Sequence, residues 1–213
     1  MTGLILKDFL VTKKTLVYML VVTALFGGVY TSMDTNYFLT FFLAIMMVSI
    51  LLSAISYDEF YHWDRYAATL PLSRRQMVLA KYLWSYILFL AGTVFAVWLQ
   101  LAAMYLKGQS VTLDDIAVMA VAPAIGLVGT AVVLPCSYKF GVQKSRLAMM
   151  VLYGVPSLLL VLALKFMPDL FREVPAVEFS PGAFVGGFYG VMAVCQVVSI
   201  LISVRVMERK ELS

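Results

Sequence analysis

Charge is scarce in this chain of 213 residues: only 13% of the residues are charged, whereas 62% are hydrophobic. Soluble domains are about 45–50% apolar and about 25% charged, so the composition excludes an ordinary soluble domain, a disordered chain and a disulfide-rich secreted module. The single histidine is His62, and the two cysteines, Cys136 and Cys195, lie in apolar runs without metal-ligand spacing. The chain also lacks a GxxxxGK[ST] phosphate loop and an HExxH motif, so we expect no catalytic residue, no metal site and no cofactor bound by this chain.

Six stretches contain no Asp, Glu, Lys, Arg or His at all. A helix needs roughly 20 apolar residues to cross about 30 Å of hydrocarbon, and each stretch is close to that length. We therefore predict an all-α, polytopic membrane protein with six transmembrane helices, in which residues 1–213 form a single transmembrane domain. The predicted spans are residues 15–33, 35–57, 82–106, 116–138, 147–164 and 179–204.

Lysine and arginine are distributed unevenly over the segments that separate these spans. Thirteen lie in the N-terminal segment, the two segments after the second and fourth spans, and the C-terminal segment, against three in the other segments. Because basic residues accumulate on the cytoplasmic side of a membrane, both termini are predicted to be cytoplasmic. The net charge is only +4 and the basic residues are scattered, which argues against a nucleic-acid partner.

Residues 2–14 precede the first span and have a helical pattern of their own. The apolar residues fall on one helical stripe and the charged residues mostly elsewhere, which predicts an N-terminal amphipathic helix in the membrane interface. A frayed basic tail is the alternative. The stripe consists of Ile5, Leu6, Phe9 and Leu10, and the charged residues are Lys7, Asp8, Lys13 and Lys14.

The spans contain uncharged polar residues, prolines and a run of spaced glycines. The absence of ionisable groups argues against ion coupling and against a membrane-embedded enzyme. Gly182, Gly186 and Gly190 follow one another at four-residue spacing, which predicts a helix-packing face either within the monomer or across a dimer. Hydrogen bonds between helices are the expected role of the polar side chains, which are Thr93, Gln100, Thr130, Ser157, Gln196 and Ser199.

The segment between the second and third spans carries the densest chemistry. Ser73 fits a helix N-cap and Gln76 the N3 position of a capping box, while Pro71 ends what precedes, so the third long helix is predicted to begin near Arg74. Residues 57–69 are predicted to form a short helix with an aromatic side. Such a helix suits a groove on a soluble partner, although a solvated loop folded back on the helix ends is equally compatible with the residues.

The residues Asp58-Glu59, Trp63-Asp64-Arg65-Tyr66, Leu70-Pro71-x-Ser73-Arg74 and Lys81-Tyr82 together resemble the signature of small bacterial ABC-2-type permeases. These are the membrane subunits of two-component ATP-binding-cassette exporters. The resemblance covers the whole chain. Within that group the chain is most similar to the permeases of phenol-soluble-modulin exporters, which expel amphipathic peptide toxins.

This resemblance implies a single permease domain that pairs with a second copy, or with a homologous permease, in the bacterial cytoplasmic membrane. Each permease would dock one cytosolic ATPase subunit, and ATP and Mg²⁺ would bind there rather than to this chain, which is then not an enzyme. Residues 57–69 would be the coupling helix and residues 2–14 the connecting helix. The implied ATPase-coupling residues are Asp58, Glu59, Phe60, Trp63, Asp64, Arg65 and Tyr66.

The predicted function is export of amphipathic or antimicrobial-type peptides by alternating access. An interior without fixed charge suits an amphipathic or lipid-like cargo better than a small ion. A peptide, a lipid or a drug as cargo, and export or flipping as the action, stay open. The alternative from another class is a non-transporting membrane immunity or sensor protein that binds a peptide toxin.

Overall fold

The computed structural model describes residues 2–30, 38–67, 69–166 and 181–209, and it contains helices and no strand within those ranges. Six of the helices are long and apolar enough to cross a membrane. The prediction of an all-α protein with six membrane-spanning helices is therefore confirmed. The helices are α1 (Thr2–Tyr30), α2 (Phe38–Phe60), α3 (Trp63–Ala67), α4 (Arg74–Leu106), α5 (Leu113–Phe140), α6 (Val142–Phe166) and α8 (Pro181–Arg209).

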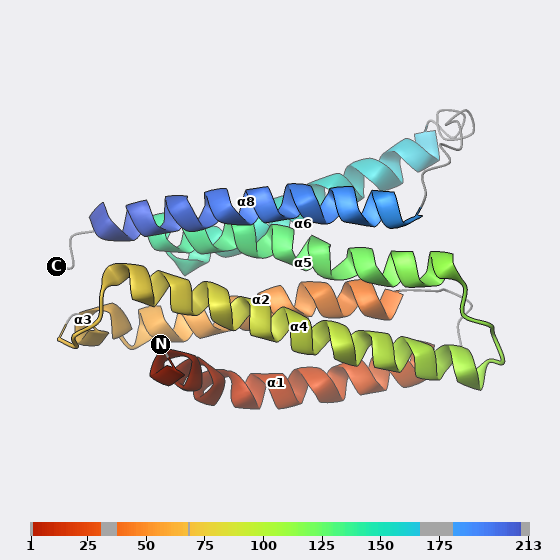
Figure 1. The fold of residues 1–213 in the computed structure, drawn as a ribbon, viewed down its shortest axis with the longest axis horizontal. Helices are drawn as coiled ribbons and strands as arrows, with labels where there is room; N and C mark the ends of the chain where they lie inside the picture. Colours follow the sequence, from red (N-terminus) through yellow and green to blue (C-terminus); the bar gives the residue numbers. More distant parts are fainter. Residues whose placement is uncertain (1, 31–37, 68, 167–180, 210–213) are drawn as a thin grey trace.

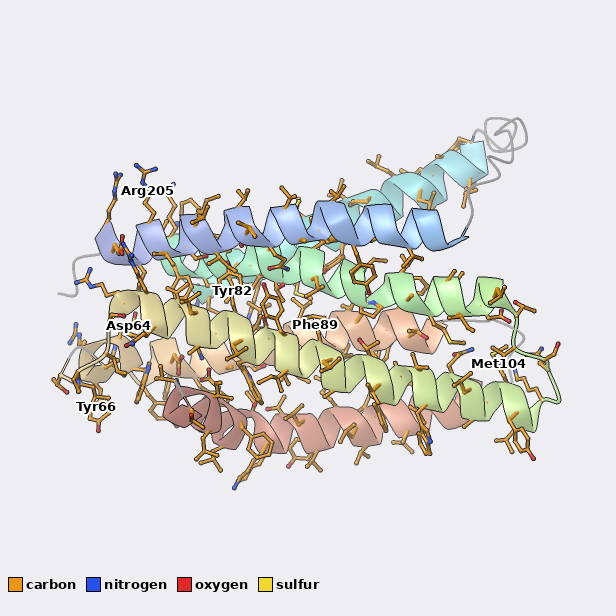
Figure 2. The ribbon with its side chains drawn as sticks, viewed as in Figure 1. Asp64, Tyr66, Tyr82, Phe89, Met104 and Arg205 are labelled. Carbon is orange, nitrogen blue, oxygen red and sulfur yellow. The ribbon has the colours of Figure 1, made fainter. Side chains whose placement is uncertain are left out.

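The long helices run side by side as an elongated bundle (Figure 1). Helix α1 begins, α8 ends and the short α3 lies at the same end of this bundle, which we call the basic end (Figure 1). The opposite end, where α4 ends and α5 begins, is the far end. Figure 2 shows Asp64, Tyr66 and Arg205 at the basic end, and Met104 near the far end.

Helix α2 lies in the centre of the bundle, where it contacts α1, α4, α5 and α6. Val48, Ile50 and Leu51 are completely or almost completely buried there, against apolar side chains such as Leu88 of α4 and Val133 of α5. In lipid, helices associate through close packing and interhelical hydrogen bonds rather than through the hydrophobic effect. Helix α6, by contrast, diverges from its neighbours along its second half (Figure 1).

Glycines permit close helix contacts at three described positions, none of which the sequence singled out. A Cβ at Gly126 of α5 would overlap the ring of Phe89 of α4, and a Cβ at Gly129 would overlap the hydroxyl of Tyr153 of α6. Gly92 of α4 is similarly close to Met47 of α2, with the nearest side-chain atom 2.8 Å from the Cβ position. These small residues let the neighbouring helices approach each other.

Of the two alternatives for Gly182, Gly186 and Gly190, packing within the monomer is not observed among the described residues. No described atom lies within 4 Å of a Cβ built at any of these positions. The reason is the orientation of α8, which turns its polar side toward α4 and α5 and its glycines away from them. Packing across a dimer stays a prediction.

The polar side of α8 joins three helices through hydrogen bonds. The hydroxyl of Tyr82 on α4 lies 2.6 Å from Oγ of Ser199 and 2.8 Å from Oγ of Ser203. Gln196 donates through Nε2 to the hydroxyl of Thr130 on α5, at 3.0 Å. Figure 2 shows Tyr82 pointing between the helices. Of the polar residues expected to bond between helices, Thr130, Gln196 and Ser199 therefore do so.

The other three polar residues behave differently. Thr93 and Ser157 donate to carbonyls of their own helices, those of Phe89 and Gly154. Gln100 is buried, and among the described residues its Oε1 has no hydrogen-bond partner. A hydroxyl can bond the carbonyl three or four residues earlier, which removes its need for another helix.

Pro135 explains one of the bonds between α5 and α8. A proline lacks the N–H that would bond the carbonyl four residues earlier, so Pro135 leaves the carbonyl of Ala131 without its helical partner. Ser199 donates its hydroxyl to that carbonyl at 2.7 Å. The neighbouring helix thus satisfies a backbone group that the proline exposes within the apolar region.

The boundaries of α1 correct one prediction. Residues 2–14 do not form a separate helix, because α1 is continuous from Thr2 to Tyr30. No proline interrupts the segment, and its only early glycine is Gly3, so nothing in the sequence stops the helix. Parts of the predicted spans 15–33, 35–57 and 179–204 lie outside the described residues.

Candidate functional site

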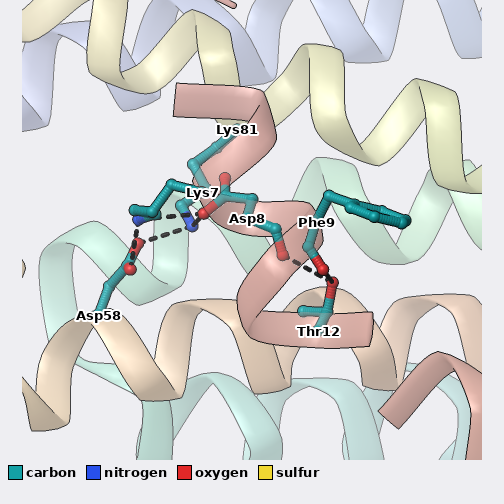
Figure 3. Close-up of polar contacts among 6 residues, drawn as sticks. All are labelled: Lys7, Asp8, Phe9, Thr12, Asp58 and Lys81. Carbon is teal, nitrogen blue, oxygen red and sulfur yellow. Dashed lines mark hydrogen bonds and ion pairs between the residues drawn. The ribbon is translucent and has the colours of Figure 1, made fainter. Parts of the chain in front are cut away.

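Four charged side chains from three helices meet at the basic end (Figure 3). Lys7 and Asp8 lie on α1, Asp58 on α2 and Lys81 on α4. The Nζ atom of Lys7 is 2.6 Å from Oδ1 of Asp58 and 3.0 Å from Oδ1 of Asp8. The Nζ atom of Lys81 is 2.7 Å from Oδ1 of Asp8 and 2.6 Å from Oδ2 of Asp58. We call these four residues the ion cluster.

The ion cluster is neutral and mostly buried. The side chain of Asp8 is 3% exposed, that of Lys81 10%, that of Asp58 14% and that of Lys7 20%. Removing a charge from water costs several kcal/mol unless an opposite charge and hydrogen bonds replace the water. Each lysine contacts both carboxylates, so the arrangement requires α1, α2 and α4 to stay together at this end.

Trp63 attaches the short helix α3 to the ion cluster. The Nζ atom of Lys7 lies 4.3 Å from the centroid of a Trp63 ring. An ammonium over an indole face is attracted by about 0.5–2 kcal/mol, depending on how far it is removed from water. Movement of α3 would therefore act directly on Lys7.

Glu59, the neighbour of Asp58, contacts the junction of α5 and α6. Its Oε2 accepts a hydrogen bond from the backbone N–H of Val142 at 2.8 Å. Val142 is the first residue of α6, so the carboxylate satisfies one of the free N–H groups at that helix start and complements its dipole. Gly141, which separates the two helices, adopts a φ of +84°, a conformation that glycine tolerates and other residues rarely adopt.

The short helix predicted over residues 57–69 is divided in the structure. Residues Tyr57 to Phe60 continue α2, and α3 spans only Trp63–Ala67. The division falls at His62, whose φ of +51° is incompatible with a right-handed helix. The prediction of one helix over 57–69 is therefore wrong, although the segment does turn at the basic end between α2 and α4.

The aromatic residues around this turn face outward. Phe60 is 75% exposed, Tyr61 72% and Tyr66 58%, and Tyr57 is also exposed. Tyr57 and Tyr61 are stacked with ring centroids 6.4 Å apart, and Phe60 meets Tyr61 edge-on at 5.0 Å. We call these four residues the aromatic surface. Exposed aromatic groups of this kind are typical of protein interfaces.

The predicted coupling residues differ in exposure and in contacts. Asp58 and Trp63 are half-buried and bind residues of other helices, and Glu59 binds the start of α6 although it is itself exposed. Phe60, Arg65 and Tyr66 are exposed. Asp64 is half-buried and lines a pocket of about 170 Å³ together with Asp58, Glu59 and Lys81.

The sequence does not predict that Lys7 and Lys81 pair with Asp8 and Asp58. It predicts Lys7 and Asp8 on the polar side of an interfacial helix, whereas Asp8 is 2% exposed. The sequence carries a signal for two of these charges, since Asp58 directly follows the predicted span 35–57 and Lys81 directly precedes the span 82–106. Lys7 and Asp8 lie further from a span, before Lys13 and Lys14. The sequence does not single out Tyr61 as a site residue either.

The start of α4 has the predicted cap and a further role. Ser73 accepts from the backbone of Gln76, and the Gln76 side chain accepts from the backbone of Ser73. Pro71 is exposed in the turn before them. Arg74 donates to the backbone carbonyls of Met207 and Glu208 at 3.1 and 2.9 Å, which satisfies carbonyls at the end of α8.

Nothing in the part of the chain that the structure describes resembles a metal site, since no group of three or more His, Cys, Asp or Glu side chains could hold a metal ion.

The arrangement at the basic end consists of an outward aromatic surface and an inward ion cluster, joined by Trp63. Trp63 and Lys7 thereby connect α3 with the ion pairs that join three long helices.

A family model described as "ABC-2 family transporter protein" matches residues 3–208. The match includes every residue of the ion cluster and of the aromatic surface. No curated protein and no solved structure matches the chain. The specific similarity to phenol-soluble-modulin exporters therefore stays a prediction.

Proposed function

Since the chain belongs to the ABC-2 transporter family and is a membrane component of an ABC transporter, we propose that it is the permease subunit of a bacterial exporter of amphipathic peptides. Membership of this family implies a cytosolic ABC ATPase as partner. ATP and Mg²⁺ would bind to that ATPase. The basic end would face the cytoplasm, because 13 of the 16 lysines and arginines lie in the segments assigned to that side.

The observation that carries this proposal is the connection between the aromatic surface and the ion cluster. Phe60, Tyr61 and Tyr66 would contact the ATPase. Trp63 lies beside Tyr66, with ring centroids 5.3 Å apart, and against Lys7 on its other side. A force applied at α3 would thereby reach α1, α2 and α4 through the four ion pairs.

ATP-driven closure of the ATPase pair would displace α3 and the end of α2 and rock the helices between inward-facing and outward-facing states. A second permease, identical or homologous, would complete the pathway. The glycine face of α8 is exposed and available for contact with such a second copy.

The lack of charged side chains in the membrane-spanning segments supports a peptide cargo. The six uncharged stretches leave no fixed charge along most of each helix. A small ion would require compensating charges there, whereas the apolar side of an amphipathic peptide would not. Such a peptide could enter from the lipid, where its apolar side is already buried.

Co-purification tests the permease assignment. The chain would be co-expressed with the candidate ATPase, purified through a tag on this chain, and weighed by native mass spectrometry. A complex of two permeases with two ATPases is the expected result. Recovery of the chain without any ATPase would contradict the proposal and favour the immunity or sensor protein.

Transport by inside-out membrane vesicles tests the cargo separately. Vesicles that contain the complex should accumulate a labelled amphipathic helical peptide when ATP is added, and should not do so with a non-hydrolysable analogue. If the complex assembles and hydrolyses ATP but the vesicles accumulate no peptide, the assignment as a permease stands and the peptide cargo is excluded.

A further inference from the structure

A lateral groove lies between α2 and α6 in the half of the bundle nearest the basic end. It consists of two adjoining hollows of about 360 and 380 Å³. Ser53 of α2 and Arg146 of α6 line both hollows, so the two form one continuous depression. Thr15 of α1 borders it at one side.

The walls of the groove differ in polarity along its length. Near the basic end Ser53, Ser56 and Arg146 line it together with three residues of the aromatic surface, Tyr57, Phe60 and Tyr61. Deeper in the bundle it is mostly apolar, with Ile45 and Leu52 from α2 and Met149, Met150 and Tyr153 from α6. The mouth thus combines one cation and two hydroxyls with aromatic side chains, which is the chemistry of a membrane interface, and the deeper part is apolar like the hydrocarbon of one leaflet.

Arg146 is the only cation in this groove, and no ion pair is formed by it in the described parts of the chain. Its sole recorded hydrogen bond is a long one, from Nη2 to Oγ of Ser56 at 3.4 Å. The cations of the ion cluster, by contrast, each contact two carboxylates. The guanidinium of Arg146 therefore keeps most of its five donors for another acceptor.

The dimensions of the groove match a single lipid chain. Ile45 and Ser56 are eleven residues apart on one helix, which corresponds to about 17 Å at a rise of 1.5 Å per residue. Half of a bilayer's hydrocarbon core is about 15 Å thick. An acyl chain beginning at the level of Arg146 would thus end near Ile45.

We propose that this groove binds one anionic glycerophospholipid from the leaflet at the basic end, with its phosphate on Arg146 and an acyl chain along α2 and α6. Arginine binds phosphate through two parallel hydrogen bonds, and basic pockets between transmembrane helices bind anionic headgroups. The hydroxyl of Ser56, which accepts from Arg146, supplies a further donor, whereas that of Ser53 already donates to the carbonyl of Ser49 at 2.9 Å. The groove shares Tyr57, Phe60 and Tyr61 with the aromatic surface, so the proposal is made for the isolated chain, in which no ATPase covers these residues, and it does not depend on the cargo.

Native mass spectrometry of the purified chain in detergent tests this lipid site. Phosphatidylglycerol and phosphatidylcholine with identical acyl chains would be added in equal amounts. We expect the wild-type chain to retain phosphatidylglycerol at least fivefold more than phosphatidylcholine. Arg146→Gln should abolish that preference. Lys144→Gln should preserve it, since Lys144 is an exposed neighbouring cation on the same helix that does not line the groove.

A second variant tests whether the acyl chain occupies the groove. Ser53→Phe would fill the part that the two hollows share and leave Arg146 in place, so it should reduce phosphatidylglycerol binding as much as Arg146→Gln does. Glycerol phosphate, which has the headgroup charge without the chain, should not displace the lipid. Melting temperatures of all variants would establish that they are folded.

Three results would overturn the proposal. The first is equal retention of the two lipids by the wild-type chain. The second is an equal loss in Arg146→Gln and Lys144→Gln, which would indicate attraction to the basic end as a whole. The third is unchanged lipid binding in Ser53→Phe, or displacement by glycerol phosphate, which would place only a headgroup or a free phosphate at Arg146.

Discussion

Lys81 and Asp8 are 73 positions apart in the chain, yet their Nζ and Oδ1 atoms lie 2.7 Å apart in a buried ion pair between α4 and α1. The pair belongs to a cluster in which each of two lysines contacts each of two aspartates. Since those four residues come from three helices, the cluster joins α1, α2 and α4 at the end where α3 is attached.

Asp8→Ala should lower the free energy of unfolding by about 3–5 kcal/mol, because it leaves the buried ammonium of Lys81 with one carboxylate in place of two. The double variant Asp8→Leu with Lys81→Met should recover part of that loss, since it removes both charges. Thermal and chemical unfolding in detergent would measure the free energies. Arg75→Ala is the control, because its ion pair with Glu208 is exposed and its loss should change little. Equal effects of Asp8→Ala and Arg75→Ala would contradict the structural importance of the cluster.

Trp63→Leu should separate ATP hydrolysis from transport. The change removes the ring that lies against Lys7 while leaving the exposed Phe60, Tyr61 and Tyr66 in place. We expect the ATPase to bind and hydrolyse ATP, whereas transport per ATP falls at least tenfold. Adding Asp64→Ala should deepen the loss without preventing membrane insertion.

The control for Trp63 is Trp98→Leu, which alters an exposed tryptophan within α4. Transport should be unaffected by that change. Wild-type transport by Trp63→Leu, or loss of ATPase binding in the single variant, would show that Trp63 does not transmit movement in the way described.

The two kinds of glycine should respond oppositely to alanine. Gly129→Ala should destabilise the protein, because a Cβ there overlaps Tyr153 and approaches Val48 to 2.9 Å. Gly186→Ala meets no atom within 4 Å and should stabilise the isolated chain by up to about 1 kcal/mol through helix propensity. Melting temperatures of the monomer in detergent would show the difference. A destabilised Gly186→Ala monomer would contradict the described orientation of α8.

Ser199→Ala should cost about 1–2 kcal/mol, since it leaves the partly buried carbonyl of Ala131 without a donor. In a Pro135→Ala background the cost should be smaller, because the amide introduced at position 135 can bond that carbonyl within the helix. A double-mutant cycle measured by unfolding in detergent gives the coupling. Equal costs of Ser199→Ala in both backgrounds would mean that the serine does not substitute for the missing amide.

The sequence was sufficient for features that depend on neighbouring residues or on long apolar runs. Charge-free stretches of membrane-spanning length predict the six long helices. The capping box of Ser73 and Gln76 predicts the start of α4, because its partners are only three positions apart. The family resemblance of residues 58–82 agrees with the match over residues 3–208.

Other features could not be read from the sequence, because they depend on which helices become neighbours. Asp8 is on the charged side of α1 in sequence, but α4 and α2 bury that side. Gly186 has the spacing of a packing glycine but faces away from the other helices, whereas Gly129 packs without a repeated pattern. The helix is interrupted at His62 because the backbone of this residue adopts a left-handed conformation. A histidine does not require that conformation, so the sequence does not predict the interruption.

Binding of the ATPase by the aromatic surface is the measurement that tests the central claim most directly. The variant Phe60→Ser, Tyr61→Ser, Tyr66→Ser would be compared with the wild type for ATPase affinity in nanodiscs. Interface aromatic residues contribute about 1.4 kcal/mol or more, so we expect the affinity to fall at least tenfold with no change in melting temperature. The matched control replaces three exposed residues at the far end by serine, Tyr105, Leu106 and Leu113. Unchanged ATPase affinity in the first variant, or an equal loss in the control, would contradict the account.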